Sequence, residues 1–191
     1  MEALDALKAA NSEFESRLRE VELEHWTLPT PCSEWDVQSL VNHVLLGTRM
    51  SVQILAGMSR EEVTAGLDDD LMSGSTDPIA SFVDLADKMV AGFSGPDGLE
   101  GMVEHPAGDF PRSVFIAFRV TDGAVHAWDL ARALGSSTAL DADLVRFLWD
   151  DVQPRREMLV ATGTFGEGPS GSIDDDAVLQ TRYLELVGRK P

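Results

Sequence analysis

The sequence has little of several residue types, and each scarcity excludes a class of protein. Cys32 is the only cysteine among 191 residues. The chain therefore cannot form an internal disulfide or a zinc site of several cysteines, and we expect a reducing, cytoplasmic location. No apolar stretch approaches the roughly 20 residues of a membrane span, and the N-terminus has no basic segment followed by an apolar one. We accordingly expect neither an export signal nor a membrane anchor.

Positive charge is also scarce. Lys and Arg number 15 against 33 Asp and Glu, which gives a net charge of −18. Because such a surface repels phosphate backbones and anionic lipid head groups, we expect no nucleic acid and no membrane among the partners. Acidity of this kind is common as a solubility feature and specifies no ligand. Hydrophobic residues make up 43% of the chain, which is enough for one substantial core, so we expect a single domain over residues 1–191.

Apolar residues recur at helical spacing along most of the chain, whereas sustained alternation of strand type does not appear. The pattern predicts a first helix that includes Val21 and ends before Leu28, a second helix from Val37 onward, and helices over residues 79–93 and 114–134. A further helix is predicted from Asp141 toward Leu159 with a break at Pro154, followed by a loop over residues 163–171 and a short helix capped by Ser172 and ended by Gly188. We expect an all-α bundle of four main helices with additional short helices.

Turn chemistry predicts what lies between these helices. Residues 66–78 and 95–111 are rich in glycine, proline and aspartate, which favours loops, with room for a short extended piece at residues 102–105. Before the second helix, Ser33 and Asp36 resemble a capping box with aspartate in the usual glutamate position. We therefore expect Ser33 to begin that helix.

Asp122 and His126 are the best lead to function, because they lie one turn apart in the predicted helix over residues 114–134. Side chains four residues apart on a helix are neighbours, so this pair could present a carboxylate oxygen and an imidazole nitrogen to one ion. His43, near the edge of the apolar stripe of an earlier helix, could add a third ligand. The pattern suggests a divalent-metal site of His43, Asp122 and His126.

A second interpretation of the same helix stays open. Arg119 and Asp129 fall in the same sector as Asp122 and His126. A polar sector of this kind is typical of the solvated face of an amphipathic helix. In that interpretation the pair is an ordinary surface feature.

Other polar residues have weaker claims. Arg49 and Arg119 could bind an anionic substrate group, although a surface or supporting role is more common. His105, which precedes Pro106 in a predicted loop, is the alternative third ligand if His43 points into the core. Each of these residues could bind a ligand, but its position in the sequence does not identify the ligand.

Four further residues lie near the predicted ligands or helix ends. We expect His25 to cap helix carbonyls as a cation and Cys32 to act as a small buried hydrophobe rather than a nucleophile. Trp35 and Trp128 adjoin the two ligand segments. They are expected to pack the core or to wall a substrate pocket.

Two long strings carry a family resemblance: WTLPTPCSEWDVQSLVNHV from Trp26 to Val44 and VTDGAVHAWDLARALG from Val120 to Gly135. A terminal FGEGP followed by LVGRKP adds to it. The chain resembles an actinobacterial group of metal-binding proteins in the DinB-like superfamily. That group is similar to the N-terminal domain of mycothiol-dependent maleylpyruvate isomerase.

The resemblance implies a DinB-like four-helix bundle that holds a divalent ion through His43, Asp122 and His126. Zinc is the first expectation, with nickel, manganese and iron as alternatives. The isomerase resembled here has a glutamate where this chain has Asp122, so the carboxylate reaches one methylene less far.

The resemblance also implies an activity. Three protein ligands leave a position for water or a thiolate, whose pKa the ion could lower. This implies a metal-dependent S-transferase or isomerase that acts on a small electrophilic molecule, with mycothiol as a candidate cosubstrate. Two alternatives stay open: a non-catalytic module that binds a metal or a small molecule, and a homodimeric interaction protein.

Overall fold

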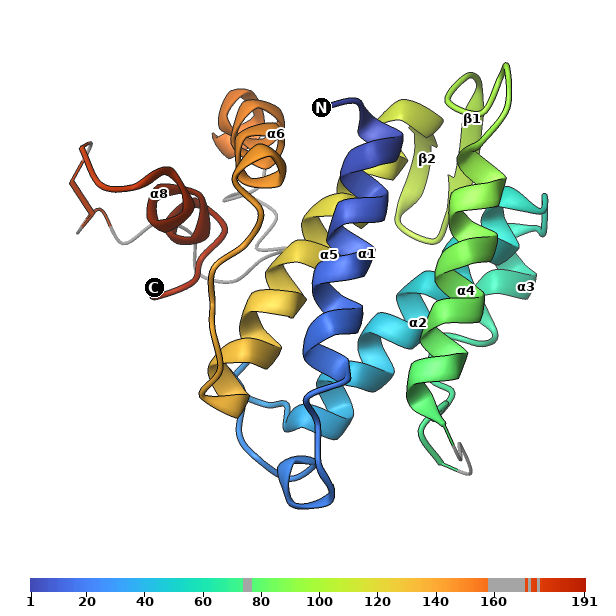
Figure 1. Ribbon diagram of the computed structural model, residues 1–191. Helices are drawn as coiled ribbons and strands as arrows, with labels where there is room; N and C mark the ends of the chain where they lie inside the picture. Colours follow the sequence, from blue (N-terminus) through green and yellow to red (C-terminus); the bar gives the residue numbers. More distant parts are fainter. Residues whose placement is uncertain (74–76, 158–170, 172, 175) are drawn as a thin grey trace. The chain divides into compact units, whose positions relative to one another are not determined.

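The computed structural model describes residues 1–73, 77–157, 171, 173–174 and 176–191 of the chain (Figure 1). Contacts divide these residues into two compact units. The larger unit comprises residues 2–138, and the smaller one comprises residue 1 and residues 139–191. The expectation of a single domain over residues 1–191 stays a prediction.

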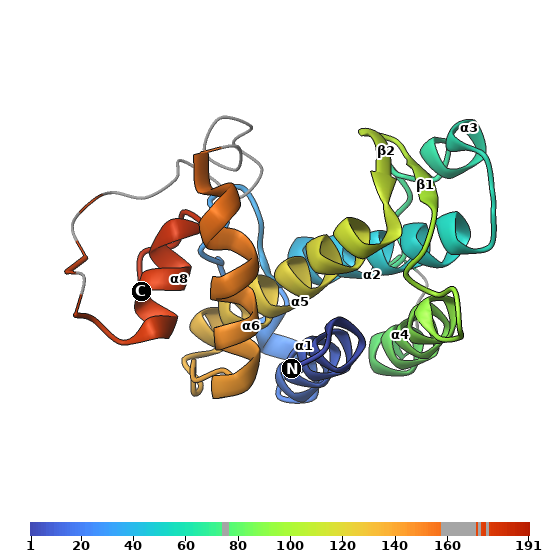
Figure 2. The same cartoon turned by 90° about the horizontal axis from the view of Figure 1, so that it is seen from above.

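The larger unit is built on four long helices: α1 (Ala3–Leu18), α2 (Val37–Leu55), α4 (Pro78–Phe93) and α5 (Arg112–Leu134). Each packs against two others, α1 against α4 and α5, and α2 against the same two helices. Figures 1 and 2 show α1 and α4 as one layer and α2 and α5 as the other. The predicted all-α four-helix bundle is confirmed.

Large apolar side chains fill the centre of this bundle. Those fully buried include Leu7, Phe14 and Leu18 of α1, Leu40 and Leu45 of α2, Phe82, Met89 and Phe93 of α4, and Phe115, Ile116 and Leu130 of α5. Burying each such side chain stabilises the fold by about 1.5–3 kcal/mol. The apolar spacing seen in the sequence therefore corresponds to the faces that meet.

Helix α5 is buried around most of its circumference. Arg119, His126 and Asp129 are buried with its apolar residues, and Asp129 is completely inaccessible. Because α1, α2 and the hairpin all contact α5, its polar sector does not face solvent. The interpretation of this sector as a solvated face is wrong.

Helix α2 begins after Asp36, whose carboxylate accepts hydrogen bonds from the Ser39 amide at 2.8 Å and from the Ser39 hydroxyl at 2.7 Å. The expectation that Ser33 caps this helix is wrong. The preceding segment is held in a turn, in which the Thr30 hydroxyl donates to the Trp35 carbonyl at 2.8 Å. This turn keeps Ser33 away from the first helical amides and places Trp35 beside the start of α2.

Two short elements, strand β2 (Gly108–Pro111) and helix α3 (Arg60–Thr64), were not expected from the sequence. Strand β2 pairs antiparallel with β1 (Met102–His105), which is the predicted extended piece. Gly108 and Pro111 favour turns, which concealed β2. Helix α3 (Arg60–Thr64) begins at a capping box formed by Ser59 and Glu62 and is too short to show periodicity.

The smaller unit contains α6 (Ala142–Val152), the 3-10 turn η2 (Gln153–Arg155) and α8 (Leu179–Leu186). Asp141 caps α6 as expected, and α6 stops before Pro154. Helix α8 packs on α6, where the Arg182 guanidinium lies 4.6 Å from the centre of the Trp149 ring. Residues 158–170 and Ser172 lie outside the described residues. The predicted extension of α6 toward Leu159, most of the predicted loop over residues 163–171 and the predicted Ser172 cap fall there. Among the helices of the described ranges, none has the length and apolar character that a membrane crossing requires.

Candidate metal centre

Helices α2 and α5 bring His43, Asp122 and His126 together. Nε2 of His43 lies 3.4 Å from Oδ1 of Asp122, and Nε2 of His126 lies 3.6 Å from the same oxygen. One potential ligand atom from each residue lies within 4.8 Å of the other two. The packing of α2 against α5 thus brings together His43 and Asp122, which are 79 residues apart in the sequence. We refer to His43, Asp122 and His126 as the ligand triad.

The distances within the ligand triad distinguish direct hydrogen bonds from the spacing of metal ligands. Good N–H···O hydrogen bonds span about 2.7–3.2 Å, so 3.4 and 3.6 Å are long for direct bonds. Nitrogen and oxygen ligands lie about 2.0–2.1 Å from zinc, which places tetrahedral neighbours roughly 3.3–3.4 Å apart. The two imidazole nitrogens therefore lie at about the distance from Oδ1 that two ligands of one ion would have.

The carboxylate of Asp122 divides its two oxygens between different neighbours. Oδ1 faces the two imidazoles, whereas Oδ2 lies 3.1 Å from Nη2 of Arg119. Burial acts to raise the pKa of the Asp122 carboxyl, but the Arg119 guanidinium and the His126 and His43 imidazoles hold it well below its usual range. Asp122 is thus an ionised donor. Its Oδ2 atom is buried and makes no hydrogen bond within the described residues.

The other nitrogen of His126 has its own partner. Nδ1 lies 3.0 Å from Oδ2 of the buried Asp129, which also accepts a hydrogen bond from Sγ of Cys32 at 3.4 Å. A carboxylate at Nδ1 favours the tautomer whose Nε2 is free to bind an ion. Burial acts to lower the pKa of His126, but Asp122, Asp129 and Cys32 together raise it to about 9. An ion at Nε2 must therefore displace a proton.

Asp129 was missed as a supporting residue in the sequence, and Cys32 was interpreted only as a small buried hydrophobe. The spacing of three residues between His126 and Asp129 in the string HAWD was the available signal. The approach of Cys32 could not be read, because it lies 97 residues from Asp129. Cys32 is half-buried in the structure.

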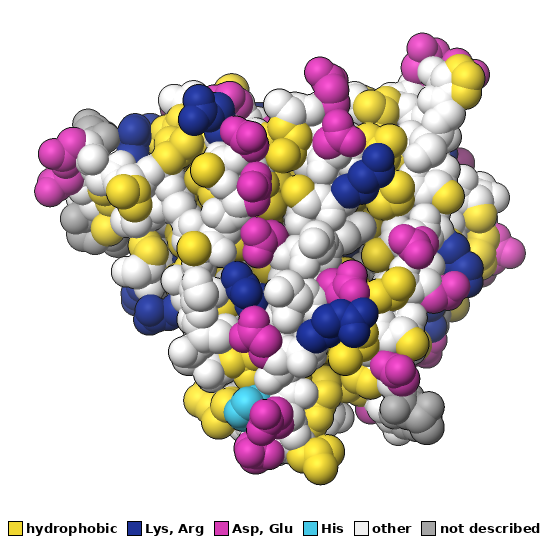
Figure 3. All heavy atoms as spheres, in the orientation of Figure 1, with side chains coloured by type: hydrophobic (Ala, Val, Ile, Leu, Met, Phe, Trp, Pro, Cys, Tyr) yellow, Lys and Arg dark blue, Asp and Glu magenta, His cyan; other side chains and the backbone are white. Residues whose placement is uncertain are grey.

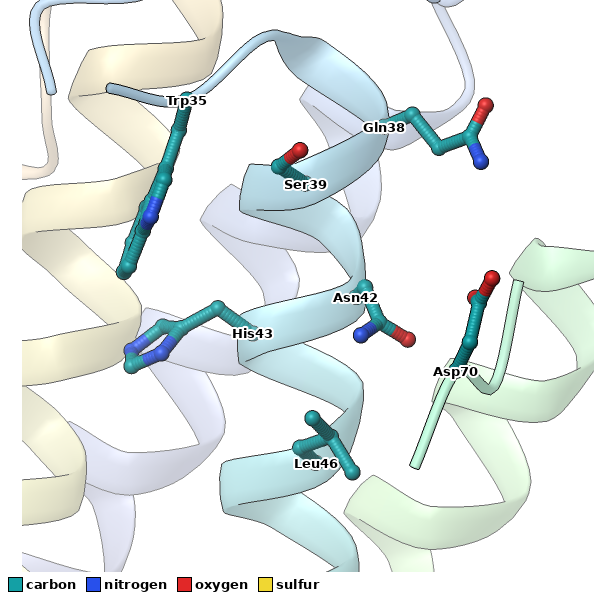
Figure 4. A pocket seen from close by; sticks show the side chains of 7 residues that line it. All are labelled: Trp35, Gln38, Ser39, Asn42, His43, Leu46 and Asp70. Atoms are coloured by element: carbon teal, nitrogen blue, oxygen red, sulfur yellow. The ribbon is translucent and has the colours of Figure 1, made fainter. Parts of the chain in front are cut away.

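A pocket opens beside the ligand triad. It has a volume of about 390 Å³ and is lined by Trp35, Gln38, Ser39, Asn42, His43, Leu46 and Asp70 (Figure 4). Small-molecule sites span about 300–1,000 Å³. His43 is the one member of the triad that lines this pocket. Its side chain is 39% exposed, against 15% for Asp122 and 7% for His126, so the triad is accessible from the His43 side.

Trp35 walls the pocket and covers the imidazoles. Its ring centre lies 4.6 Å from that of His43 and 5.8 Å from that of His126. The turn before α2 therefore places an aromatic ring over the triad, in agreement with the pocket interpretation of Trp35. Trp128 instead belongs to the core, where it is buried and contacts the Arg132 guanidinium.

The two arginines considered for anion binding are both engaged with acidic side chains. Arg49 pairs with Asp69 at 2.9 Å and donates to the Gly66 carbonyl. Arg119 pairs with Asp122. Neither lines the pocket beside His43.

The remaining histidines lie elsewhere. His105 is on β1, where Nδ1 accepts from the Ala107 amide at 3.0 Å, and it belongs to no group of potential ligands among the described residues. His25, in the 3-10 turn η1 (Leu23–His25), accepts at Nδ1 from the Glu22 amide at 3.1 Å. His25 thus caps an amide rather than carbonyls, contrary to the expectation.

Comparison with known proteins places these features in a family context. The family model of the mycothiol maleylpyruvate isomerase N-terminal domain matches residues 7–131, which include the whole ligand triad. Two proteins of Mycobacterium tuberculosis, from strains CDC 1551 / Oshkosh and H37Rv, are 33% identical to this chain over 144 residues. These matches cover 75% of this chain and 74% of each relative, and both relatives are described as uncharacterized.

Solved structures show the same fold. The crystal structure of the mycothiol-dependent maleylpyruvate isomerase aligns with a TM-score of 0.58 at 15% identity, covering 78% of this chain and 68% of that one. A histidine-to-alanine mutant of that isomerase gives the same TM-score at 14% identity. The DinB-like helical bundle implied by the resemblance is confirmed.

Proposed function

The chain belongs to the mycothiol maleylpyruvate isomerase N-terminal domain family, and from that membership we propose that it binds one divalent metal ion through His43, Asp122 and His126. We further propose that it uses this centre as an S-transferase or isomerase on a small electrophilic molecule, with mycothiol as the thiol. Zinc is the first expected ion, and nickel, manganese and iron also suit two imidazoles and a carboxylate.

The spacing of the ligand triad carries this proposal. The separations of 3.4 and 3.6 Å from Asp122 Oδ1 are too long for good hydrogen bonds and close to those between ligands of one ion. Oδ2 of the buried Asp122 carboxylate is paired with Arg119, whereas Oδ1 faces both imidazoles, so Oδ1 is the oxygen available to an ion.

The chain's own residues have distinct roles in this proposal. The Asp129 carboxylate holds the Nδ1 proton of His126, which directs Nε2 toward Asp122. Trp35 covers one side of the imidazoles and limits the access of water. The pocket beside His43 admits the thiol and the electrophile. A bound divalent ion would lower the pKa of the thiol, so that it is ionised near neutral pH.

The chemistry requires a thiol that acts as a nucleophile. In transfer, its sulfur forms a bond to an electrophilic carbon, and its proton passes to the departing group or to the adjacent carbon. In isomerisation, the same sulfur adds and then departs, so the thiol is regenerated. Both reactions are tested by incubating the protein with mycothiol and small electrophiles and by following thiol loss and product mass. No thiol-dependent product with any electrophile would contradict the enzymatic part.

The metal is tested separately, by elemental mass spectrometry on protein purified without an affinity tag. We expect about one metal ion per chain, lost in His43→Ala and in His126→Ala. Metal that persists at the same stoichiometry in both variants would contradict the proposed site. A metal-loaded protein without thiol-dependent activity would leave the alternative, a metal-binding module without catalysis. The cytoplasmic location and the homodimer stay predictions from the sequence.

A further inference from the structure

Arg119 is a positively charged residue buried inside the bundle, so its burial has to be explained by what the charge contacts. The residue is 8% exposed, and its Nε atom is buried without a hydrogen bond within the described residues. Burying a guanidinium is costly unless it is paired. Its charged partner is Asp122, with Nη2 3.1 Å from Oδ2. The ion pair therefore places a permanent cation directly against one residue of the ligand triad.

Gly47 provides the space that Arg119 occupies. It lies on α2 one turn after His43, and a Cβ atom at this position would be 2.9 Å from Nη1 of Arg119, 3.1 Å from Nη2 and 3.3 Å from Cζ. Any other side chain would therefore push the guanidinium away. The helix that supplies His43 thus also supplies the gap in which the guanidinium of Arg119 lies.

The two contacts together constrain the Asp122 carboxylate. Oδ2 is directed toward Arg119, and Oδ1 is left facing Nε2 of both imidazoles. We propose that Arg119, seated against Gly47, is a positioning residue that holds Asp122 so that a single oxygen is offered to the metal. This inference rests on the metal site of the proposed function and adds the residues that orient it.

A simpler role for Arg119 would be to neutralise Asp122 wherever its guanidinium lies. The two roles predict opposite changes in metal affinity. Without a neighbouring cation, a carboxylate attracts a divalent ion more strongly, so loss of a mere counter-charge should tighten binding. Loss of an orienting group should weaken it, by about 10–100-fold for residues that hold metal ligands in place.

The test compares three variants with the wild type. Arg119→Met removes the charge, and Gly47→Ala keeps the charge but displaces the guanidinium. Gly123→Ala is the matched control, because its added Cβ meets the Ala10 Cβ at an ordinary 3.5 Å. The Zn²⁺ dissociation constant is measured by competition with a chelator of known affinity, and thermal unfolding is measured on the metal-free proteins.

We expect Arg119→Met and Gly47→Ala to bind Zn²⁺ at least about tenfold more weakly than the wild type. Gly123→Ala should bind as the wild type does. Metal-free Gly47→Ala should lose less stability than metal-free Arg119→Met, because it keeps both charges of the pair and alanine favours a helix over glycine. Similarly weakened Zn²⁺ binding in two variants of different stability would separate positioning from a purely structural role.

Equal or tighter Zn²⁺ binding by Arg119→Met and Gly47→Ala would overturn the inference and leave the metal site intact. If Arg119→Met does not fold, Gly47→Ala alone decides. A wild type that binds no Zn²⁺ would instead contradict the proposed function. The two failures are thus distinguishable.

Discussion

Two histidine-containing regions of the larger unit satisfy their polar groups in different ways. In the hairpin region, His105 Nδ1 accepts from the Ala107 amide at 3.0 Å, and Arg60 Nε donates to the His105 carbonyl at 2.9 Å and pairs with Asp109. Within the ligand triad, the closest approaches between its own members are 3.4 and 3.6 Å, both from Oδ1 of Asp122.

The difference separates a structural histidine from a candidate ligand. Buried polar groups in native proteins are almost always hydrogen-bonded, so a group that is left incomplete needs an explanation. The polar atoms of the hairpin region meet at ordinary hydrogen-bond distances, whereas the atoms that face one another in the triad are spaced as ligands of an ion are. Figure 3 adds that acidic side chains are distributed over several elements of the face it shows. Acidic residues alone therefore identify no site, and the distances and burial at the triad do.

Substitution of one histidine from each region gives the sharpest contrast. His126→Ala should lose the bound metal completely, because it removes one of three ligands. His105→Ala should keep about one ion per chain. Elemental mass spectrometry on both proteins checks this, and equal metal content in the two variants would remove the distinction between the regions.

Substitution of the acidic residues extends the comparison to stability. Asp122→Asn leaves the buried Arg119 without its counter-charge, which should destabilise the metal-free protein by roughly 3 kcal/mol. Asp109→Asn should cost less than about 1 kcal/mol, since the Arg60–Asp109 pair is exposed. Urea unfolding of the metal-free proteins measures both changes, and a larger loss in Asp109→Asn would contradict this account.

Metal removal should act through the triad alone. At a free Zn²⁺ concentration of 100 times the dissociation constant, binding stabilises the fold by about 2.7 kcal/mol. Chelation should therefore lower the melting temperature of the wild type and of His105→Ala by the same amount. It should leave His126→Ala unchanged. A fall in the melting temperature of His126→Ala would place the ion elsewhere.

The two histidines should also respond to pH with opposite sign in the metal-free protein. The pKa of His126 is raised to about 9, so its contribution to stability is present below about pH 6.5 and is lost as pH rises through 9. Burial, with the Arg119 and Arg60 guanidinium groups, lowers the pKa of His105. Its contribution is therefore present above about pH 6.5 and is lost as pH falls.

Urea unfolding across this pH range, on wild type, His126→Ala and His105→Ala, checks the two signs. The pH-dependent part of the His126→Ala difference should shrink as pH rises through 9, and that of His105→Ala should shrink in acid. The same sign for both variants would refute the contrast. Because His126 must lose its proton to bind an ion, metal affinity should rise with pH over the same interval.

Helices α2, α4 and α5 were predictable because helical periodicity is a local property of the chain. The apolar stripe Val37, Leu40, Val41, Val44 and Leu45 is buried along α2 as expected. Local signals failed where a nearby turn competed with them. The turn through Thr30 and Trp35 moved the cap of α2 from Ser33 to Asp36.

The candidate site was predictable only in part. Asp122 and His126 share one helix, so their proximity follows from a spacing of four residues. The approach of His43 to Asp122, and of Gly47 to Arg119, joins different helices. These contacts depend on how α2 and α5 pack, which no periodicity in either helix reveals.

The sequence by itself determined the helices, the Asp122 and His126 pair and the resemblance to a metal-binding family. Tertiary structure alone decided that the polar sector of α5 is buried, that His43 rather than His105 meets the pair, and that Gly47 lies against Arg119. The physical reason is that side-chain spacing along a helix is set by local backbone geometry. Burial, and the contacts between residues of different helices, are set by how those helices pack.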